Sequence, residues 1–358
     1  MKTQSVRKRF ESALAGEFIK QPIYAVYDWF AQNRPAVDWE SLFEQGLGQI
    51  NHANLIRHEH PGFKIIETSS LQDGEIRRDV RWVTDIGELH EWYLGEWKKE
   101  HFIKTPNDYK IMAHALKKVK VIADETPFLD SEAALGDRGI TLGQLHGLDR
   151  GRTPLMALQV DWIGLEQFSI DLAYELPELL ELVEIMTEIK LEEIRQAVKT
   201  PAKYIKLWEN LSIETLGPVY YKRYFAPLYK QILEIMNKAG KRLLVHYDGQ
   251  MKVIAEDIAQ LDIDGIDSFT EAPEGNVTTA EARKFWPEKF LWQNINLGWY
   301  ELPAEEFKRN IERVINEAGR KRHCLMISEE VPESWHKTVP FVLETINTIN
   351  NPTEYSVS

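Results

Sequence analysis

The chain has 358 residues, 43% of them hydrophobic and 28% charged, which is enough apolar material for a large core and excludes a disordered chain. Its net charge of −13 argues against nucleic-acid binding, because phosphate backbones are bound by an excess of Lys and Arg. The single cysteine excludes an internal disulfide, and there is neither an apolar run of about 18 residues nor a signal segment, so we expect a cytoplasmic protein without membrane contacts.

The first third of the chain is predicted to combine helices with antiparallel hairpins. Residues 4–16 are expected to form a helix that ends at Gly16, and residues 22–28 a first strand. Residues 61–94 alternate between polar and apolar side chains around two glycine-containing turns, which is typical of hairpins. A helix is expected over 107–120. We expect the hairpins to be an insertion, or lid, that partly covers the functional site.

From residue 154 onward, short apolar runs alternate with amphipathic stretches. Predicted strands begin near residues 154, 204, 242, 265, 290 and 323, and predicted helices cover 177–199, 219–239, 250–261 and 304–318. This alternation indicates right-handed βαβ units and a parallel sheet. With the first strand and one more, the units would close a (β/α)8 TIM barrel, with the hairpins inserted near its N-terminus, as a single domain over 1–358. The alternative is an open doubly wound sheet, but the chain lacks the Gly-x-Gly-x-x-Gly turn of such folds.

Polar residues follow several of the predicted strands. Because the carboxyl ends of parallel strands meet at one mouth, these residues predict one polar site and an enzyme. The candidates by strand are Asp161 and Trp162, Glu209 and Asn210, His246 and Asp248, Asn294, and Glu329.

Catalysis and substrate binding are divided among these residues by their chemistry. The predicted catalytic residues are Asp161, Glu209 and the neighbouring Asn210. They would act as an acid, a base or a hydrogen-bond partner of the substrate. The alternative is that these residues cap the helix that follows each strand. A substrate pocket is predicted from residues after the first strand and from later strand ends, although aromatic residues there could also serve packing. Its members are Tyr24, Tyr27, Asp28, Trp162 and Asn294, with Arg34 nearby.

A metal site is the third expectation. His246 and Asp248 lie two residues apart at a strand end, and Glu329 follows the last strand. One histidine and two carboxylates suit a zinc ion with an open position. The alternative is that His246 and Asp248 bond one another and cap a helix. Cys324 lies five residues before Glu329, about 16 Å along an extended strand, so it cannot share the ion and is expected to serve packing.

Six segments, in this order, resemble the uroporphyrinogen decarboxylase superfamily, which includes corrinoid-linked methyltransferases. They are residues 7–16, 103–109, 243–249, 265–267, 292–294 and 329–332. The resemblance implies a (β/α)8 barrel. The decarboxylases hold the carboxylates of a tetrapyrrole with an Arg-x-x-Gly-Arg loop after the first strand. Here that region begins Tyr27-Asp28-Trp29-Phe30, which would repel a polycarboxylate.

The methyltransferase branch resembles this chain more closely. That branch binds zinc through a His-x-Cys strand end and a cysteine three residues before a late proline, positions occupied here by His246, Asp248 and Glu329. Oxygen ligands in place of thiolates make zinc a harder Lewis acid, suited to an ether oxygen. The resemblance therefore implies O-demethylation of a methoxylated aromatic compound. The chain has no Asp-x-His-x-x-Gly cobalamin motif, so a separate corrinoid protein would accept the methyl group.

Two other functions remain open from the sequence. One is a metal-free decarboxylase of a small acid that uses Asp28 and the polar strand ends. The other is a barrel that binds a ligand or partner without catalysis. Bound zinc would favour the zinc-dependent methyltransferase over both of these functions.

Overall fold

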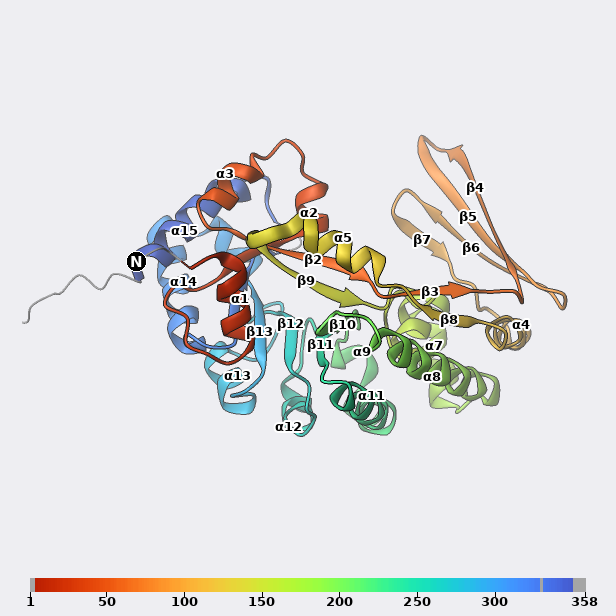
Figure 1. Ribbon diagram of the computed structural model, residues 1–358. Coiled ribbons are helices and arrows are strands. Elements are labelled where there is room, and N and C mark those ends of the chain that lie inside the picture. The colour runs from red at the N-terminus through yellow and green to blue at the C-terminus, as the bar shows by residue number, and fades with distance from the viewer. Residues whose placement is uncertain (1–3, 329–330, 350–358) are drawn as a thin grey trace, which may run out of the picture.

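Eight parallel strands close a barrel in the computed structural model, which describes residues 4–328 and 331–349 (Figure 1). In barrel order they are β1 (Tyr24–Tyr27), β2 (Gly48–Asn54), β9 (Gly139–Gln144), β10 (Tyr204–Leu207), β11 (Arg242–His246), β12 (Gly265–Phe269), β13 (Phe290–Asn294) and β14 (His323–Met326). β1 pairs with both β2 and β14, which closes the ring. The predicted (β/α)8 barrel is confirmed.

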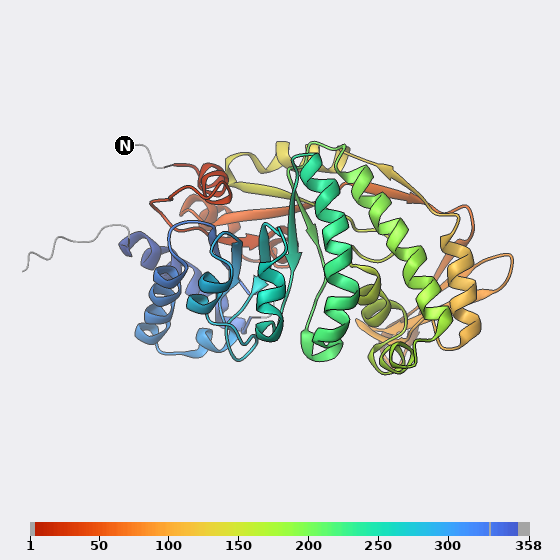
Figure 2. The same cartoon turned by 90° about the horizontal axis from the view of Figure 1, so that it is seen from below.

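Helices connect the strands around the outside of the barrel (Figure 2). They are α1 (Val6–Leu14), α2 (Asp28–Gln32), α3 (Trp39–Glu44), α5 (Thr126–Leu135), α6 (Pro154–Met156), α7 (Leu165–Ala173), α8 (Pro177–Ala197), α9 (Ile213–Leu216), α10 (Pro218–Tyr220), α11 (Ala226–Lys238), α12 (Ala255–Ala259), α13 (Thr279–Phe285), α14 (Ala304–Ala318) and α15 (Thr338–Ile349). Within the described ranges, no helix combines the length and the apolar character that a membrane span requires.

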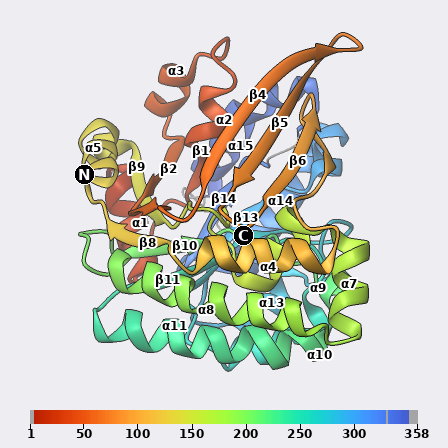
Figure 3. The same ribbon diagram turned by 90° about the vertical axis from the view of Figure 1, so that its right-hand side faces the viewer.

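An antiparallel insertion lies between β2 and β9. It comprises β3 (Ile56–Glu59), β4 (Lys64–Gln72), β5 (Glu75–Val83), β6 (Glu88–Leu94), β7 (Trp97–Glu100), α4 (Pro106–Leu116) and β8 (Lys120–Ala123). Strands β4 to β7 form one sheet that stands beyond the barrel strands, and β3 pairs with β8 at its base (Figures 1 and 3). The hairpins predicted over 61–94 are confirmed, and β7 extends them by one strand.

One predicted strand is wrong, and two barrel strands were not predicted. Residues 154–160 form α6 and a π-helical turn (Ala157–Trp162) instead of a strand. A short apolar run cannot by itself distinguish a strand from a buried helix, and Pro154 at the first helical position favours the helix. β2 and β9 have polar or glycine residues at many positions, so they lack the apolar signature of a barrel strand.

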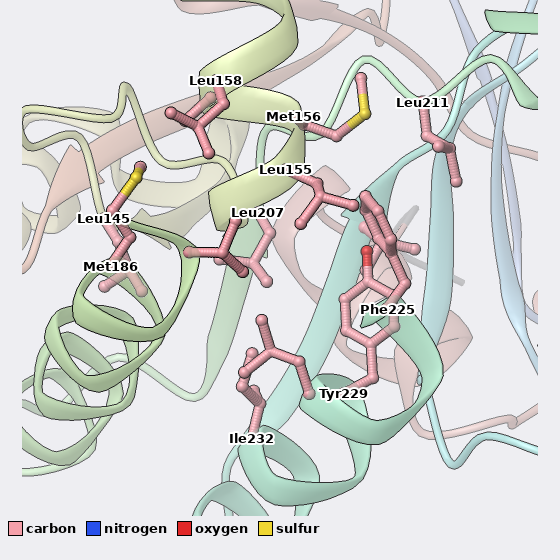
Figure 4. Close-up of a cluster of buried hydrophobic side chains, with 14 of the residues drawn as sticks. Leu145, Leu155, Met156, Leu158, Met186, Leu207, Leu211, Phe225, Tyr229 and Ile232 are labelled. Carbon is pink, nitrogen blue, oxygen red and sulfur yellow. The ribbon is translucent and has the colours of Figure 1, made fainter. Parts of the chain in front are cut away.

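Side chains fill the barrel on both faces of its wall. Inside, the rings of Phe290 and Trp292 lie 3.9 Å apart, and Gly265 makes room for them, since a Cβ there would lie 2.7 Å from Trp292. Cys324 is fully buried in the same cluster, as expected of a packing residue. Outside the wall, leucine, methionine and aromatic side chains from α6, α8, β10 and α11 pack into a second cluster (Figure 4).

Candidate functional site

A buried charge network occupies the centre of the barrel near the carboxyl ends of its strands. Asp267 on β12 accepts three hydrogen bonds, from Lys206 Nζ at 2.6 Å, from His246 Nδ1 at 2.7 Å and from the Tyr27 hydroxyl at 2.5 Å. Burial by itself would raise the pKa of Asp267, but the Lys206 ammonium and the His246 hydrogen bond hold that pKa well below its ordinary value. Asp267 is therefore an anion that only accepts, and His246 carries its hydrogen on Nδ1.

A second acid–imidazole pair extends this network toward the surface. His52 Nδ1 lies 3.1 Å from Asp28 Oδ1, and His52 Nε2 lies 3.3 Å from Lys206 Nζ. Burial and the Lys206 charge lower the pKa of His52, so its imidazole is neutral. A neutral ring bound in this way donates from Nδ1 to Asp28 and accepts from Lys206 at Nε2. The two histidines are thus linked through Lys206 and Asp267.

A cavity of about 390 Å³ opens above β1, β2, β9 and β10; we call it the aromatic cavity. Its lining residues are Asp28, Trp29, His52, Gln144, His146, Arg150, Arg152 and Trp208. Trp208 lines the cavity, and Nζ of the buried Lys206 lies 3.4 Å from the centre of its indole ring. Its indole nitrogen donates to Gln144 at 2.8 Å, which fixes the ring plane. The volume lies within the range of small-molecule sites.

A second cavity, of about 320 Å³, opens above β11 to β14; we call it the hydroxyl cavity. Its lining residues are Asp248, Gly249, Ser268, Thr270, Glu274, Asn294, Ile295, Leu297 and Ser328. Asn294 donates to the Ser268 hydroxyl at 2.9 Å, and Ser268 has a positive φ of 62°. Strained backbone of this kind is often retained where a side chain must be aimed at a ligand. The barrel mouth therefore has two cavities, one lined by tryptophans and arginines and the other mainly by hydroxyl, amide and carboxylate groups.

The predicted metal ligands can be placed only in part. Asp248 lines the hydroxyl cavity, and the ring centroid of His246 lies 5.3 Å from that of Trp208, which lines the aromatic cavity. Glu329 lies outside the described residues. In residues 4–328 and 331–349, no group of three or more His, Cys, Asp or Glu side chains is arranged to hold an ion. The three-ligand site stays a prediction.

His246 has the surroundings of a zinc-binding histidine. Metal-bound histidines generally donate their second ring nitrogen to a carboxylate, which fixes the tautomer. Asp267 holds Nδ1 of His246 in this manner, so Nε2 is the ring nitrogen that could bind a metal. The alternative in which Asp248 takes this hydrogen bond is wrong, because Asp267 takes it instead.

Asp161 and Trp162 lie on the π-helical turn and not at a strand end, so the prediction of their position is wrong. The Asp161 carboxylate contacts Arg152 at 3.0 Å and Arg150 at 3.6 Å, behind the wall of the aromatic cavity. Trp162 is buried and packs edge-on against Trp82 of the hairpin sheet. Neither residue lines the aromatic or the hydroxyl cavity, so a role for Asp161 in the reaction would act through the arginines.

Glu209 follows β10 as predicted, but its carboxylate points into the barrel wall. One oxygen accepts from the backbone and hydroxyl of Thr153, at 3.0 and 2.8 Å, and the other accepts from Tyr229 at 3.0 Å. Tyr229 belongs to the hydrophobic cluster outside the barrel wall (Figure 4). Burial raises the pKa of Glu209. Asn210 is exposed, with a φ of 48°. Glu209 thus bonds residues of the protein interior and not the next helix, α9, whose N-cap is Ser212. The catalytic roles of Glu209 and Asn210 stay a prediction.

The residues predicted to shape the substrate pocket separate into three groups. Asp28 lines the aromatic cavity and Asn294 the hydroxyl cavity. Tyr27 lies beneath the mouth, where it binds Asp267, and Tyr24 is buried in the barrel core. Arg34 lies over the ring of Phe30, 3.6 Å from its centre. Their roles in substrate binding remain predictions.

The sequence patterns did not identify several residues of the site. His52 and Lys206 lie within strands rather than after them, and Asp267 lies in the middle of β12. A charged residue inside an otherwise apolar strand, as in Tyr204-Ile-Lys206-Leu, was the signal available for Lys206. Arg150 and Arg152 lie in the loop after β9, a strand that was not predicted, so their position at the mouth could not be inferred.

Comparisons with known proteins agree with this architecture. A family model described as uroporphyrinogen decarboxylase (URO-D) matches residues 163–348. No curated protein matches the chain. The fold is similar to that of a methyltransferase from Methanosarcina mazei, with 12% identity and a TM-score of 0.57, covering 98% of this chain and 100% of that chain. A B12-independent methionine synthase from Shewanella sp. W3-18-1 in complex with selenomethionine aligns with 9% identity and a TM-score of 0.43, over 87% and 84% of the two chains.

Proposed function

Since the chain belongs to the uroporphyrinogen decarboxylase family, we propose that it is a methyltransferase whose active site lies at the barrel mouth between the two cavities. Its reaction would be zinc-dependent cleavage of a methyl ether in a methoxylated aromatic compound. The methyl group would pass to a corrinoid carried by a separate protein.

The observation that supports this proposal most is the Asp267–His246 hydrogen bond beside Asp248. It presents Nε2 of a buried histidine in the way that zinc-binding histidines are presented. Zinc held by His246, Asp248 and Glu329 would supply a Lewis acid for the ether oxygen. Lys206 assists indirectly, because its charge keeps Asp267 ionised and therefore able to accept from His246.

The aromatic cavity supports an aromatic substrate. Trp29 and Trp208 offer flat apolar faces, and Gln144, whose Oε1 accepts from Trp208, offers its amide NH2 group as a hydrogen-bond donor. Asp28 and Lys206 hold His52 from both sides, so its ring is fixed relative to the cavity. A ring bound there would lie beside His246, which neighbours Trp208. The similarity in fold to a methyltransferase is consistent with this arrangement.

Zinc content and methyl transfer together test the proposal. The purified protein should bind about one zinc per chain and methylate cob(I)alamin, or a corrinoid protein, from a methoxylated aromatic donor. His246→Ala and Glu329→Ala should each lose zinc and transfer while keeping the far-ultraviolet circular dichroism spectrum. His114→Ala is the matched control, because His114 pairs with an acid, Asp85, far from the mouth in α4. Full zinc binding by His246→Ala would contradict the ligand assignment.

A metal-free decarboxylase is the second candidate. The observation in its favour is the hydrogen-bonded Asp28–His52 pair that lines a cavity with two arginines, because such a pair is suited to proton transfer and the arginines to an acid. Release of carbon dioxide from a small aromatic acid by metal-free protein, abolished in Asp28→Asn, would favour this function over methyl transfer.

A further inference from the structure

Two arginines in the aromatic cavity share a single carboxylate. Arg152 Nη1 contacts Asp161 at 3.0 Å, whereas Arg150 Nε lies 3.6 Å from the same carboxylate. The Arg152 side chain is 12% exposed, and its Nε is buried without a hydrogen-bond partner. A buried guanidinium nitrogen without a partner is costly unless a ligand satisfies it. Both arginines line the cavity, so the missing acceptor can come from a bound molecule.

The backbone conformation of Arg150, in the loop after β9, supports a role for this residue in ligand binding. Arg150 has a φ of 54°, a conformation that favours glycine or asparagine over a long side chain. The Arg150 side chain is 46% exposed, and its Nη2 donates to the Tyr93 hydroxyl of β6 at 3.2 Å. The guanidinium is thus held at the cavity rim by the hairpin sheet, at the expense of an unfavourable backbone conformation. Placement of this kind is typical of functional residues.

The remaining acid of the cavity does not compete for the arginines. Asp28 Oδ1 accepts from His52 Nδ1 at 3.1 Å and from the backbone of Trp29 at 2.9 Å, and Oδ2 accepts from the backbone of His52 at 3.0 Å. Its two oxygens are therefore occupied on the strand side of the cavity. On the opposite side, in the loop after β9, Arg150 and Arg152 share the single carboxylate of Asp161. This local excess of positive charge occurs in a protein with a net charge of −13.

We propose that Arg150 and Arg152 form an anion subsite, and that the substrate is a single-ring aromatic ether with a carboxylate. The ether group of this substrate rests on the proposed function, whereas its carboxylate is inferred from the arginines that line the cavity. The ring would lie against Trp29 and Trp208, and the carboxylate would accept from the two guanidinium groups, which bind planar anions through paired hydrogen bonds. The arginines are specificity-determining residues, and compounds lacking the acid are poor substrates.

Binding of a matched pair of probes to the full chain tests the subsite without any methyl transfer. We expect 4-methoxybenzoate to bind about 10-fold to 100-fold more tightly than 4-methoxybenzamide, the effect of one charge-assisted hydrogen bond. Quenching of tryptophan fluorescence or titration calorimetry measures both affinities. Equal affinities, or no binding of either probe at millimolar concentration, would overturn the proposal.

Substitutions assign the effect to the arginines. Arg150→Asn should bring the two probes to similar affinity while the melting temperature stays the same or rises, because asparagine tolerates this φ. Arg152→Lys should also weaken the acid selectively, because lysine cannot make paired hydrogen bonds. Arg195→Gln is the matched control, since that arginine is also 46% exposed, pairs with one acid and lies on α8. A preference that persists in both cavity variants would overturn the subsite.

The same samples separate this inference from the proposed function. Selective binding of 4-methoxybenzoate without methyl transfer to cob(I)alamin would sustain the subsite and contradict the demethylase. Transfer from acid and amide at similar kcat/KM, unchanged in Arg150→Asn, would sustain the demethylase and overturn the subsite.

Discussion

Replacing Lys206 by methionine tests the central charge network most directly. The Lys206 and Asp267 side chains are both fully buried, and Nζ lies 2.6 Å from Oδ2. Methionine keeps most of the length of the side chain and removes its charge, so Asp267 becomes a buried anion without its cation. Loss of one partner of a buried pair costs about 3–5 kcal/mol of unfolding free energy. We expect a loss of that size in urea denaturation at pH 7.

The pH dependence gives the sign of the effect. In the native protein the pKa of Asp267 is lowered, so its contribution to stability is present above the unfolded pKa of about 4 and is lost as the pH falls below it. Without Lys206, burial, the largest influence on this group, raises its pKa. Lys206→Met should therefore regain stability relative to the native protein as the pH falls from 7 toward 4.

The single variant Asp267→Asn and the double variant Lys206→Met, Asp267→Asn complete the cycle. Removal of both charges should recover part of the loss, because the penalty comes mainly from the unpaired anion. A single variant that loses less than about 1 kcal/mol, or a double variant no more stable than the single one at pH 7, would show that Asp267 is not a desolvated anion and would refute the reasoning.

Three further changes address the site and the core. Asp28→Ala should lower turnover more than the melting temperature, because Asp28 lines the aromatic cavity and orients His52; parallel losses in activity and unfolding assays would instead indicate a structural role. Glu209→Gln should cost about 1–3 kcal/mol in urea unfolding while zinc content stays constant, since its carboxylate serves the protein interior; loss of zinc in metal analysis would make it a ligand. Gly265→Ala should cost about 1–3 kcal/mol, because the new Cβ would lie 2.7 Å from Trp292, and unchanged denaturant unfolding would contradict that packing.

Local patterns in the sequence predicted most of the architecture. The antiparallel hairpins of 61–94 have alternating side chains and glycine turns, so short-range information was enough to identify them. Five of the six apolar runs from residue 154 onward are barrel strands, because strands buried on both faces consist largely of apolar residues. The polar residues after β11 were predicted to lie at the mouth, and Asp248 does line a cavity there.

Only the tertiary structure decided the remainder. β2 and β9 have few apolar residues because their inward positions, such as His52 and Gln144, reach the polar mouth, so their sequences did not identify them as strands. The helical state of residues 154–160 depends on packing, which a short apolar run does not encode. The partner of His246 also came from another strand: Asp267 follows it by 21 residues, and β11 pairs with β12 so that the two side chains meet. Periodicity and turn residues act over a few positions and can be recognised along the chain, whereas ion pairs across a closed barrel depend on strand register, which is set only when all eight strands have paired.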